Sequence, residues 1–103
     1  MNKISQFNKQ VFRKLDKIPR GRVTTYKILA QACGHGGAAR AVGNALKRNP
    51  DLFFRPCHRV VKSDGSLGGY VQGRNKKFLI LRREGVSVKD GRIQNFKKIL
   101  YKF

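Results

Sequence analysis

The sequence predicts a mainly α-helical domain, a winged-helix-like helix-turn-helix fold with a small β-hairpin wing. The first observation behind this prediction is a pair of short helical patterns, at residues 26–33 and 38–48, separated by a glycine-rich turn. The second is a pair of short apolar runs around a turn at residues 63–66, which is typical of a hairpin. The chain has 103 residues, 40% of them hydrophobic, so we expect a single domain over residues 1–103.

The charge balance predicts a polyanionic partner. The chain carries 24 lysines and arginines against 5 acidic residues, a net charge of +19, and such self-repulsion weakens a compact monomer unless a polyanion relieves it. Nucleic acid is the main candidate, because bound phosphates release their counterions. A membrane surface fits less well, since the basic residues are interleaved with Gly, Asn and Tyr instead of lining one amphipathic helix. Structured RNA is a further alternative to duplex DNA.

Cellular location and metal binding are predicted from what the sequence lacks. It has no apolar run of signal-peptide type and none approaching the roughly 18 residues of a membrane span, so we expect a cytoplasmic protein, or a nuclear one in a eukaryote. In such a reducing compartment Cys33 and Cys57 should stay free. His35 and His58 have no zinc-ligand spacing, and no metal site is expected.

Residues 5–18 predict the first helix, because their apolar side chains recur on one helical face. Ser5 is the candidate N-cap, and the Pro-Arg-Gly sequence at residues 19–21 is expected to end the helix. The apolar face consists of Phe7, Val11, Phe12, Leu15 and Ile18.

The two central helices form the predicted helix-turn-helix. Residues 26–33 are expected to form one helix, with Thr25 as its cap and Gly34 just beyond its end. The other spans residues 38–48 and ends before Pro50. Its outer face carries, at i, i+4 and i+7, the polar residues Arg40, Asn44 and Lys47. Small residues would also suit a plain αα-hairpin, and the net charge favours the DNA-binding interpretation.

The C-terminal half is predicted to contain the wing and two further helices. Strands at residues 59–62 and 67–71 would form the hairpin. Residues 76–84 predict a helix that Gly85 stops, followed by a short strand and turn at residues 86–91 and an amphipathic helix over residues 93–103. The expected core residues of the helix at 76–84 are Phe78, Leu79 and Leu81.

The sequence from Arg55 to Val61 concentrates reactive chemistry, because it sets Cys57 directly before His58. A thiol reacts as its thiolate and needs help to ionise. Neighbouring side chains on an extended chain point in opposite directions, so His58 would act through a water molecule or after a kink, oriented by a third group. Glu84 is either that third group or an ordinary surface partner of nearby arginines. A buried, inert cysteine remains the alternative.

Residues 56–61, Pro-Cys-His-Arg-Val-Val, are similar to the active-site signature of the O6-alkylguanine-DNA alkyltransferases, also called methylated-DNA–protein-cysteine methyltransferases. The resemblance extends over roughly residues 5–90. Upstream it includes Thr25-Tyr26, Gly34, Ala39-Arg40-Ala41-Val42-Gly43 and Asn49-Pro50. Downstream it includes Gly65, Gly69-Tyr70, Gly73, Lys77, Leu81 and Glu84-Gly85.

The resemblance implies a single-use DNA repair protein that flips an O6-alkylguanine out of duplex DNA and moves the alkyl group onto its own cysteine, as a monomer without a cofactor. Carried over by position, Cys57 is the alkyl acceptor and His58 a water-mediated base that Glu84 orients. Asn49 braces the hydrogen-bond network, and Tyr70 holds or protonates the guanine at O6. The reaction needs extrusion of the base, because a stacked and paired guanine is inaccessible.

The same resemblance assigns DNA contacts. Arg40 would fill the space of the extruded base, and Tyr26 would contact the guanine or its phosphate. The helix at residues 38–48 would lie in the minor groove, where small residues such as Ala39 permit close approach. Further contacts to DNA are expected from Asn44, Lys47 and Arg59. Family members commonly carry an additional N-terminal domain of RNase H-like fold, whereas this sequence begins almost directly at the catalytic domain. Related alkyltransferase-like proteins lack the cysteine, so Cys57 favours transfer.

Overall fold

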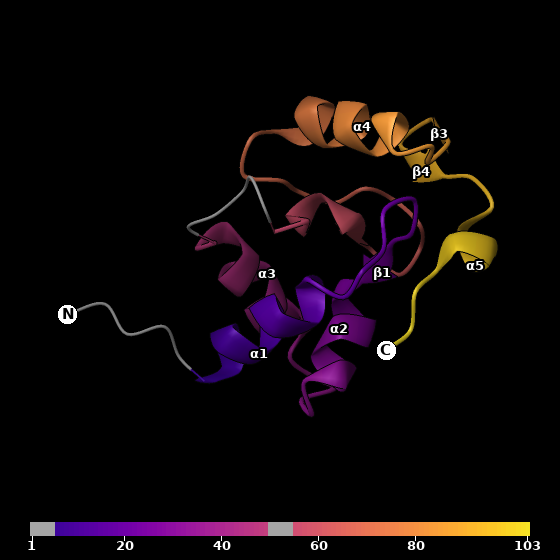
Figure 1. The fold of residues 1–103 in the computed structure, drawn as a ribbon. Coiled ribbons are helices and arrows are strands. Elements are labelled where there is room, and N and C mark those ends of the chain that lie inside the picture. Colours follow the sequence, from indigo (N-terminus) through magenta and orange to yellow (C-terminus); the bar gives the residue numbers. More distant parts are fainter. Residues whose placement is uncertain (1–5, 50–54) are drawn as a thin grey trace.

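A computed structural model describes residues 6–49 and 55–103, and within these ranges the chain is mostly helical, as predicted (Figure 1). Three N-terminal helices pack together, and α4 lies on the other side of a short parallel strand pair. The described elements, in chain order, are α1 (Gln6–Leu15), β1 (Thr24–Thr25), α2 (Tyr26–Ala32), α3 (Ala39–Lys47), the 3-10 helix η1 (Cys57–Arg59), β2 (Val60–Val61), α4 (Arg74–Arg83), β3 (Val88–Lys89), β4 (Arg92–Ile93) and α5 (Phe96–Ile99).

The helices α1, α2 and α3 confirm the three predicted N-terminal helices, each within a few residues of its expected bounds. The Thr25 hydroxyl accepts a hydrogen bond of 3.0 Å from the Ile28 amide and so caps α2. Gly34 adopts a φ of +81°, the left-handed conformation that ends a helix. The expected cap Ser5 and the helix-stopping Pro50 lie outside the described residues.

Two hydrophobic cores flank the parallel strand pair. The first core lies among α1, α2 and α3, and the second lies beneath α4. Val60 belongs to the first core and Val61 to the second, because successive side chains of a strand point to opposite faces. Strand β2 follows η1 directly, and Cys57, at the start of η1, belongs to the first core.

The predicted wing at residues 59–62 and 67–71 is wrong. Strand β2 pairs in parallel with β1, in the register Thr24 to Val60 and Thr25 to Val61. Residues 67–71 form no strand, because Gly68 adopts a φ of +73° and the flanking carbonyls turn toward a buried lysine. The antiparallel hairpin instead joins β3 and β4, where the sequence predicts only one strand and a turn.

The predicted C-terminal helix over residues 93–103 is also wrong, because only Phe96–Ile99 is helical. The following residues return along β1: the Val23 amide donates to the Ile99 carbonyl and the Tyr101 amide to the Val23 carbonyl. The side chains of Arg22 and Thr24 donate to carbonyls of this same segment. Long-range hydrogen bonds therefore hold the chain end extended beside β1, as Figure 1 shows.

Helix α4 confirms the prediction of a helix in this region but not its buried face. Leu81 is fully buried and Phe78 packs against the second core, whereas Leu79 is 51% exposed. The position one turn before Leu81 is occupied by Lys77, and this lysine is fully buried. Gly85 follows the helix with a φ of +87°, as expected of a helix stop.

Candidate active site

Cys57 lies at the start of a tight turn, not on an extended segment as the sequence predicts. The Cys57 amide donates to the Arg55 carbonyl at 2.9 Å and the Arg59 amide to the Pro56 carbonyl at 3.0 Å. This turn provides a kink, which is one of the two ways in which His58 is predicted to act on Cys57; the other is an intervening water molecule. Only 4% of Cys57 is exposed.

A short hydrogen-bond relay holds the sulfur. The Asn49 Nδ2 donates to the Cys57 Sγ at 2.9 Å, and Arg55 Nη1 donates to the Asn49 Oδ1 at 3.3 Å, which orients the amide. Burial raises the pKa of the Cys57 thiol, while the Asn49 hydrogen bond and the Arg55 charge oppose that rise. The pKa stays above its usual value, so the resting cysteine keeps its proton at neutral pH and needs a base to react.

His58 and Arg59 both converge on one carboxylate. His58 Nε2 lies 3.0 Å from Glu84 Oε2, and Arg59 donates to the two Glu84 oxygens at 3.0 and 2.6 Å. Burial lowers the pKa of His58, against the opposing effect of Glu84, so the imidazole is neutral and free to accept a proton. Burial alone would raise the pKa of Glu84, but hydrogen bonds from Arg59 and His58 lower it, which keeps the carboxylate charged.

The sequence places Arg59 among the DNA-binding residues, whereas its guanidinium points into the protein. Besides its two hydrogen bonds to Glu84, Arg59 Nη1 donates to the Ile18 carbonyl at 2.8 Å. Its side chain is 16% exposed and that of Glu84 only 6%. A planar guanidinium matches a carboxylate in this two-contact geometry. Arg59 therefore orients Glu84 and joins the active-site turn to the segment that follows α1.

Replacing Glu84 by alanine is expected to destabilise the fold by about 2 kcal/mol, because it leaves the half-buried Arg59 charge without its partner. The Glu84 contribution is fully present above the ordinary glutamate pKa of 4.5 and is lost as pH falls through the lower pKa of the folded state. Urea unfolding of the parent and the Glu84→Ala protein between pH 3 and 7 should show a difference in the free energy of unfolding, and this difference should become smaller as the pH falls.

The matched control for this experiment is Asp16→Ala, which removes an exposed carboxylate just beyond α1. Its free energy of unfolding should stay within about 0.5 kcal/mol of the parent value. A Glu84→Ala protein as stable as the Asp16→Ala protein would contradict the structural importance of the Glu84 contacts.

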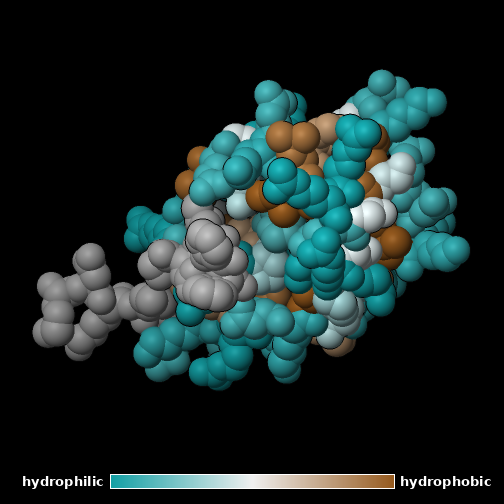
Figure 2. All heavy atoms as spheres, turned by 45° about the horizontal axis from the view of Figure 1, so that its top comes forward, coloured by the Kyte–Doolittle hydropathy of each residue, from teal (hydrophilic) through white to brown (hydrophobic). Residues whose placement is uncertain are grey.

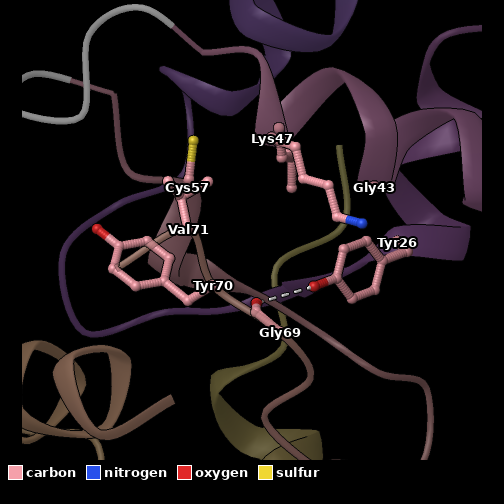
Figure 3. Close-up of a pocket in the computed structure, with 8 residues that line it drawn as sticks. Tyr26, Gly43, Lys47, Cys57, Gly69, Tyr70 and Val71 are labelled. Atoms are coloured by element: carbon pink, nitrogen blue, oxygen red, sulfur yellow. Dashed lines mark hydrogen bonds between the residues drawn. The ribbon is translucent and has the colours of Figure 1, made fainter. Parts of the chain in front are cut away.

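Cys57 borders a cavity of about 560 Å³. Figure 3 shows its lining, with Tyr26 and Tyr70 on either side and the Tyr26 hydroxyl directed at the Gly69 carbonyl, 3.5 Å away. Burial and the nearby Cys57 both raise the pKa of each tyrosine, so the hydroxyls remain hydrogen-bond donors. The residues that line the cavity are Tyr26, Gly43, Leu46, Lys47, Cys57, Gly69, Tyr70 and Val71.

Tyr70 separates this cavity from a second one, of about 680 Å³, that His58 and Glu84 line. Cys57 borders the first cavity and His58 the second, although the two residues are adjacent in sequence. Among the described residues, no hydrogen bond joins the sulfur to the imidazole: Asn49 donates to the sulfur, and Glu84 contacts the imidazole. Proton transfer between them would need an intervening water molecule.

The outer face of α3 meets the mouth of the cavity. Gly43 and Lys47 line it, and a Cβ atom at Gly43 would meet no atom within 4 Å, so this side of the helix is open. Arg40, Asn44 and Lys47 are exposed, as predicted, and Ala39 is half-buried at the first turn. Hydrophilic side chains also cover most of the molecular face that carries α4 (Figure 2).

Sequence reasoning assigned no role to two residues of this site, Arg55 and Lys77, although it included both in the motifs that it singled out. Arg55 orients Asn49 and lies 4.5 Å from the ring centre of Phe12, a cation-π contact that holds it in place. Lys77 is buried behind the cavity wall. Its spacing from Leu81, four residues on one helical face, is the signal that could have placed it in the core.

Within the described ranges, no group of three His, Cys, Asp or Glu residues is arranged to hold a metal ion. The helices of these ranges are all too short or too polar to cross a membrane.

Comparison with known families identifies the relationship. The profile described as "6-O-methylguanine DNA methyltransferase, DNA binding domain" matches residues 6–86. The chain belongs to this family. All of the predicted catalytic residues, from Asn49 to Glu84, lie inside the matched segment.

Curated members of the methyltransferase family share close to half of the aligned residues. A bifunctional methyltransferase/endonuclease of Picrophilus torridus is 48% identical over 83 residues, covering 81% of this chain and 28% of that protein. A methylated-DNA–protein-cysteine methyltransferase of Methanosarcina barkeri is 45% identical over 80 residues, covering 78% of this chain and 51% of that protein. The chain thus spans about half or less of the length of these relatives.

Solved structures of methyltransferase relatives have the same fold. S. pombe Atl1, in a complex with damaged DNA containing O6-carboxymethylguanine, superposes with a TM-score of 0.84 at 27% identity and covers 99% of this chain and 100% of its own. Mycobacterium tuberculosis OGT, in a complex with DNA, superposes with a TM-score of 0.78 at 40% identity and covers 81% of this chain and 51% of its own.

Proposed function

We propose that this protein repairs DNA by transferring the alkyl group from O6 of guanine in duplex DNA to Cys57, once per protein molecule. The observation that carries the proposal is the position of the Cys57 sulfur, which Asn49 holds at the wall of a cavity of about 560 Å³. A neutral imidazole with its own carboxylate follows directly in the chain. Nucleophile, base and orienting acid are the three parts that activated-thiol chemistry requires.

In the proposed reaction, Sγ attacks the alkyl carbon as the thiol proton passes to His58 through a water molecule. Glu84 stabilises the imidazolium that forms, because its carboxylate lies 3.0 Å from the ring nitrogen. The alkyl carbon–O6 bond breaks and its electron pair stays with the guanine. The guanine gains one proton, which the Tyr70 hydroxyl delivers and the imidazolium replaces through solvent. The net change is one thiol and one O6-alkylguanine converted to one thioether and one guanine.

We also propose that α2, the turn after it and α3 act as a helix-turn-helix that carries the lesion to the cavity. The outer face of α3 supports this role, because it exposes Arg40, Asn44 and Lys47, and Lys47 itself lines the cavity that Cys57 borders. A duplex guanine must leave the base stack to bring O6 within reach of Sγ. In this proposal the Arg40 side chain, which is exposed on α3, enters the vacated space.

The test is intact-mass analysis after incubation with a duplex that contains one O6-methylguanine. The protein should gain the mass of one methylene group, as a methyl replaces the thiol hydrogen, and peptide mapping should place it on Cys57. The gain should saturate at one per molecule, because no step restores the thiol. Absence of any adduct on a protein that binds the duplex would rule out the transfer reaction.

Lesion binding without transfer is the second candidate, and the end-to-end match to S. pombe Atl1 supports it. A lesion sensor of this kind would bind alkylated duplex more tightly than unmodified duplex and show no change in mass. The cysteine at the cavity wall favours transfer, since a sensor has no need of an oriented nucleophile with an adjacent base.

A further inference from the structure

Lys77 is the largest fully buried side chain among the described residues. A buried ammonium is costly unless hydrogen bonds replace its water. Its Nζ donates to the Val60 carbonyl at 2.7 Å, to the Gly69 carbonyl at 3.1 Å and also to the Leu67 carbonyl. An ammonium has three hydrogens, so all of them are used. The lysine thus makes a complete set of contacts with backbone groups that belong to two separate segments.

These carbonyls belong to the two segments that form the active site. Val60 begins β2, directly after the turn that carries Cys57. Leu67 and Gly69 belong to the segment that leads into Tyr70, and Gly69 itself lines the cavity. Lys77 therefore ties the nucleophile segment to the opposite wall of the cavity.

The cavity wall has a conformation that depends on this tie. Gly68 adopts a φ of +73°, and a Cβ atom there would lie 3.1 Å from the Tyr26 hydroxyl. The segment forms no strand, and the Leu67 amide, which donates to the Gly91 carbonyl at 3.2 Å, holds its first residue. The Tyr26 hydroxyl reaches the Gly69 carbonyl at the long distance of 3.5 Å. The ammonium makes the stronger, charge-assisted contacts to this segment.

Resting on the proposed alkyl transfer, we propose that Lys77 is a positioning residue for that reaction, because it sets the separation between the Cys57 sulfur and the Tyr70 side of the cavity. It does not touch the substrate. Near-attack geometry demands a reacting pair about 3 to 3.5 Å apart, and a displacement of about 1 Å costs on the order of 100-fold in rate. Loss of the tie leaves the thiol intact but misplaces its reaction partner.

Protonation of Lys77 offers a readout that a purely structural side chain would not provide. Burial lowers the pKa of Lys77 to about 7, with Cys57 acting to raise it and Arg74, on its own helix, acting to lower it. Tyr26 faces the ammonium from α2, its ring centre 5.9 Å from Nζ. A neutral amine has only two hydrogens, so one of the three carbonyls loses its donor as pH rises through this pKa.

The first experiment compares parent, Lys77→Met and Lys76→Met proteins in single-turnover transfer from free O6-benzylguanine between pH 5.5 and 9. Lys76 is the exposed neighbour on α4 and serves as the matched control. Lys77→Met should react about 100-fold more slowly, while Lys76→Met reacts like the parent. The parent rate should include a step with a midpoint near 7 that Lys77→Met lacks. Folding is verified by circular dichroism, and a folded Lys77→Met protein with parental rates overturns the proposal.

A second measurement needs no variant and so holds even if Lys77→Met fails to fold. In the parent protein, NMR titration should show the Lys77 ε-carbon and the Tyr70 ring resonances changing with one shared midpoint. The neighbouring groups titrate elsewhere, since burial lowers the pKa of His58 and raises that of Cys57. If the Tyr70 resonances do not change with pH at the midpoint of the Lys77 titration, the proposal is overturned. A parent that titrates as expected but transfers no alkyl group refutes the proposed function instead.

Discussion

The Cys57→Ser protein is expected to transfer no alkyl group while still binding alkylated duplex DNA. A serine hydroxyl is far less acidic than a thiol, and neutral His58 lacks the basicity to generate an alkoxide. The substitution preserves the site otherwise, because the Asn49 amide that donates to Sγ at 2.9 Å is equally able to donate to a hydroxyl oxygen. Intact-mass analysis should show no adduct, and fluorescence anisotropy should give a dissociation constant within about twofold of the parent value.

Cys33→Ala supplies the matched control for the loss of the thiol. Cys33 is also buried, in the first core at the end of α2, but it does not line the cavity beside Cys57. This variant should still acquire one adduct per molecule. An adduct on the Cys57→Ser protein, or its loss from a folded Cys33→Ala protein, would contradict the assignment of Cys57 as the acceptor.

The Arg40→Ala protein should lose about 100-fold in transfer from duplex DNA and almost nothing in transfer from free O6-benzylguanine. Extrusion of a paired base costs a few kcal/mol, and only the duplex reaction includes that step. Arg40 is exposed on the outer face of α3 and makes no hydrogen bond or ion pair that the described structure records, so its removal should leave the fold intact. The comparison uses single-turnover rates on both substrates.

The control for Arg40 is Arg48→Ala, which removes an equal charge at the other end of α3. Loss of one phosphate contact weakens duplex binding modestly and reduces its salt dependence, whatever the sequence. Both substrates should therefore keep their parental reaction rates at saturating protein. Equal losses on duplex and free base in Arg40→Ala would eliminate the proposed role in extrusion.

The N-terminal half of the fold could be predicted because its signals are local. The apolar face of α1, the Thr25 cap of α2 and the left-handed Gly34 each act within a few residues of themselves. The Cys57, His58 and Glu84 group could be predicted because the resemblance relates these residues at fixed intervals. The structure adds the surroundings of this group, which are the turn at η1 and the cavity that Cys57 borders.

The C-terminal half could not be predicted in the same way, because its short segments are placed by distant partners. Periodicity alone suggested a hairpin at residues 59–71. In the structure β2 pairs with β1, and the carbonyls on either side of Gly68 accept hydrogen bonds from Lys77. Four-residue α5 ends where the chain begins to bond with β1. Strand propensity identifies a segment that can form a strand, but the packing of side chains from distant segments decides which strand becomes its partner.

By itself, the sequence determined the three N-terminal helices and the family and predicted the candidate reacting residues, since each depends on neighbours in the chain or on the order of motifs along it. Only the tertiary structure decided the surroundings of two cations, the half-buried Arg59 and the buried Lys77. Arg59 and Lys77 read as surface charges along the sequence, but each meets its acceptors from segments many residues away. A charge enters the interior only where the fold has gathered enough acceptors to replace water, and no local pattern records that assembly.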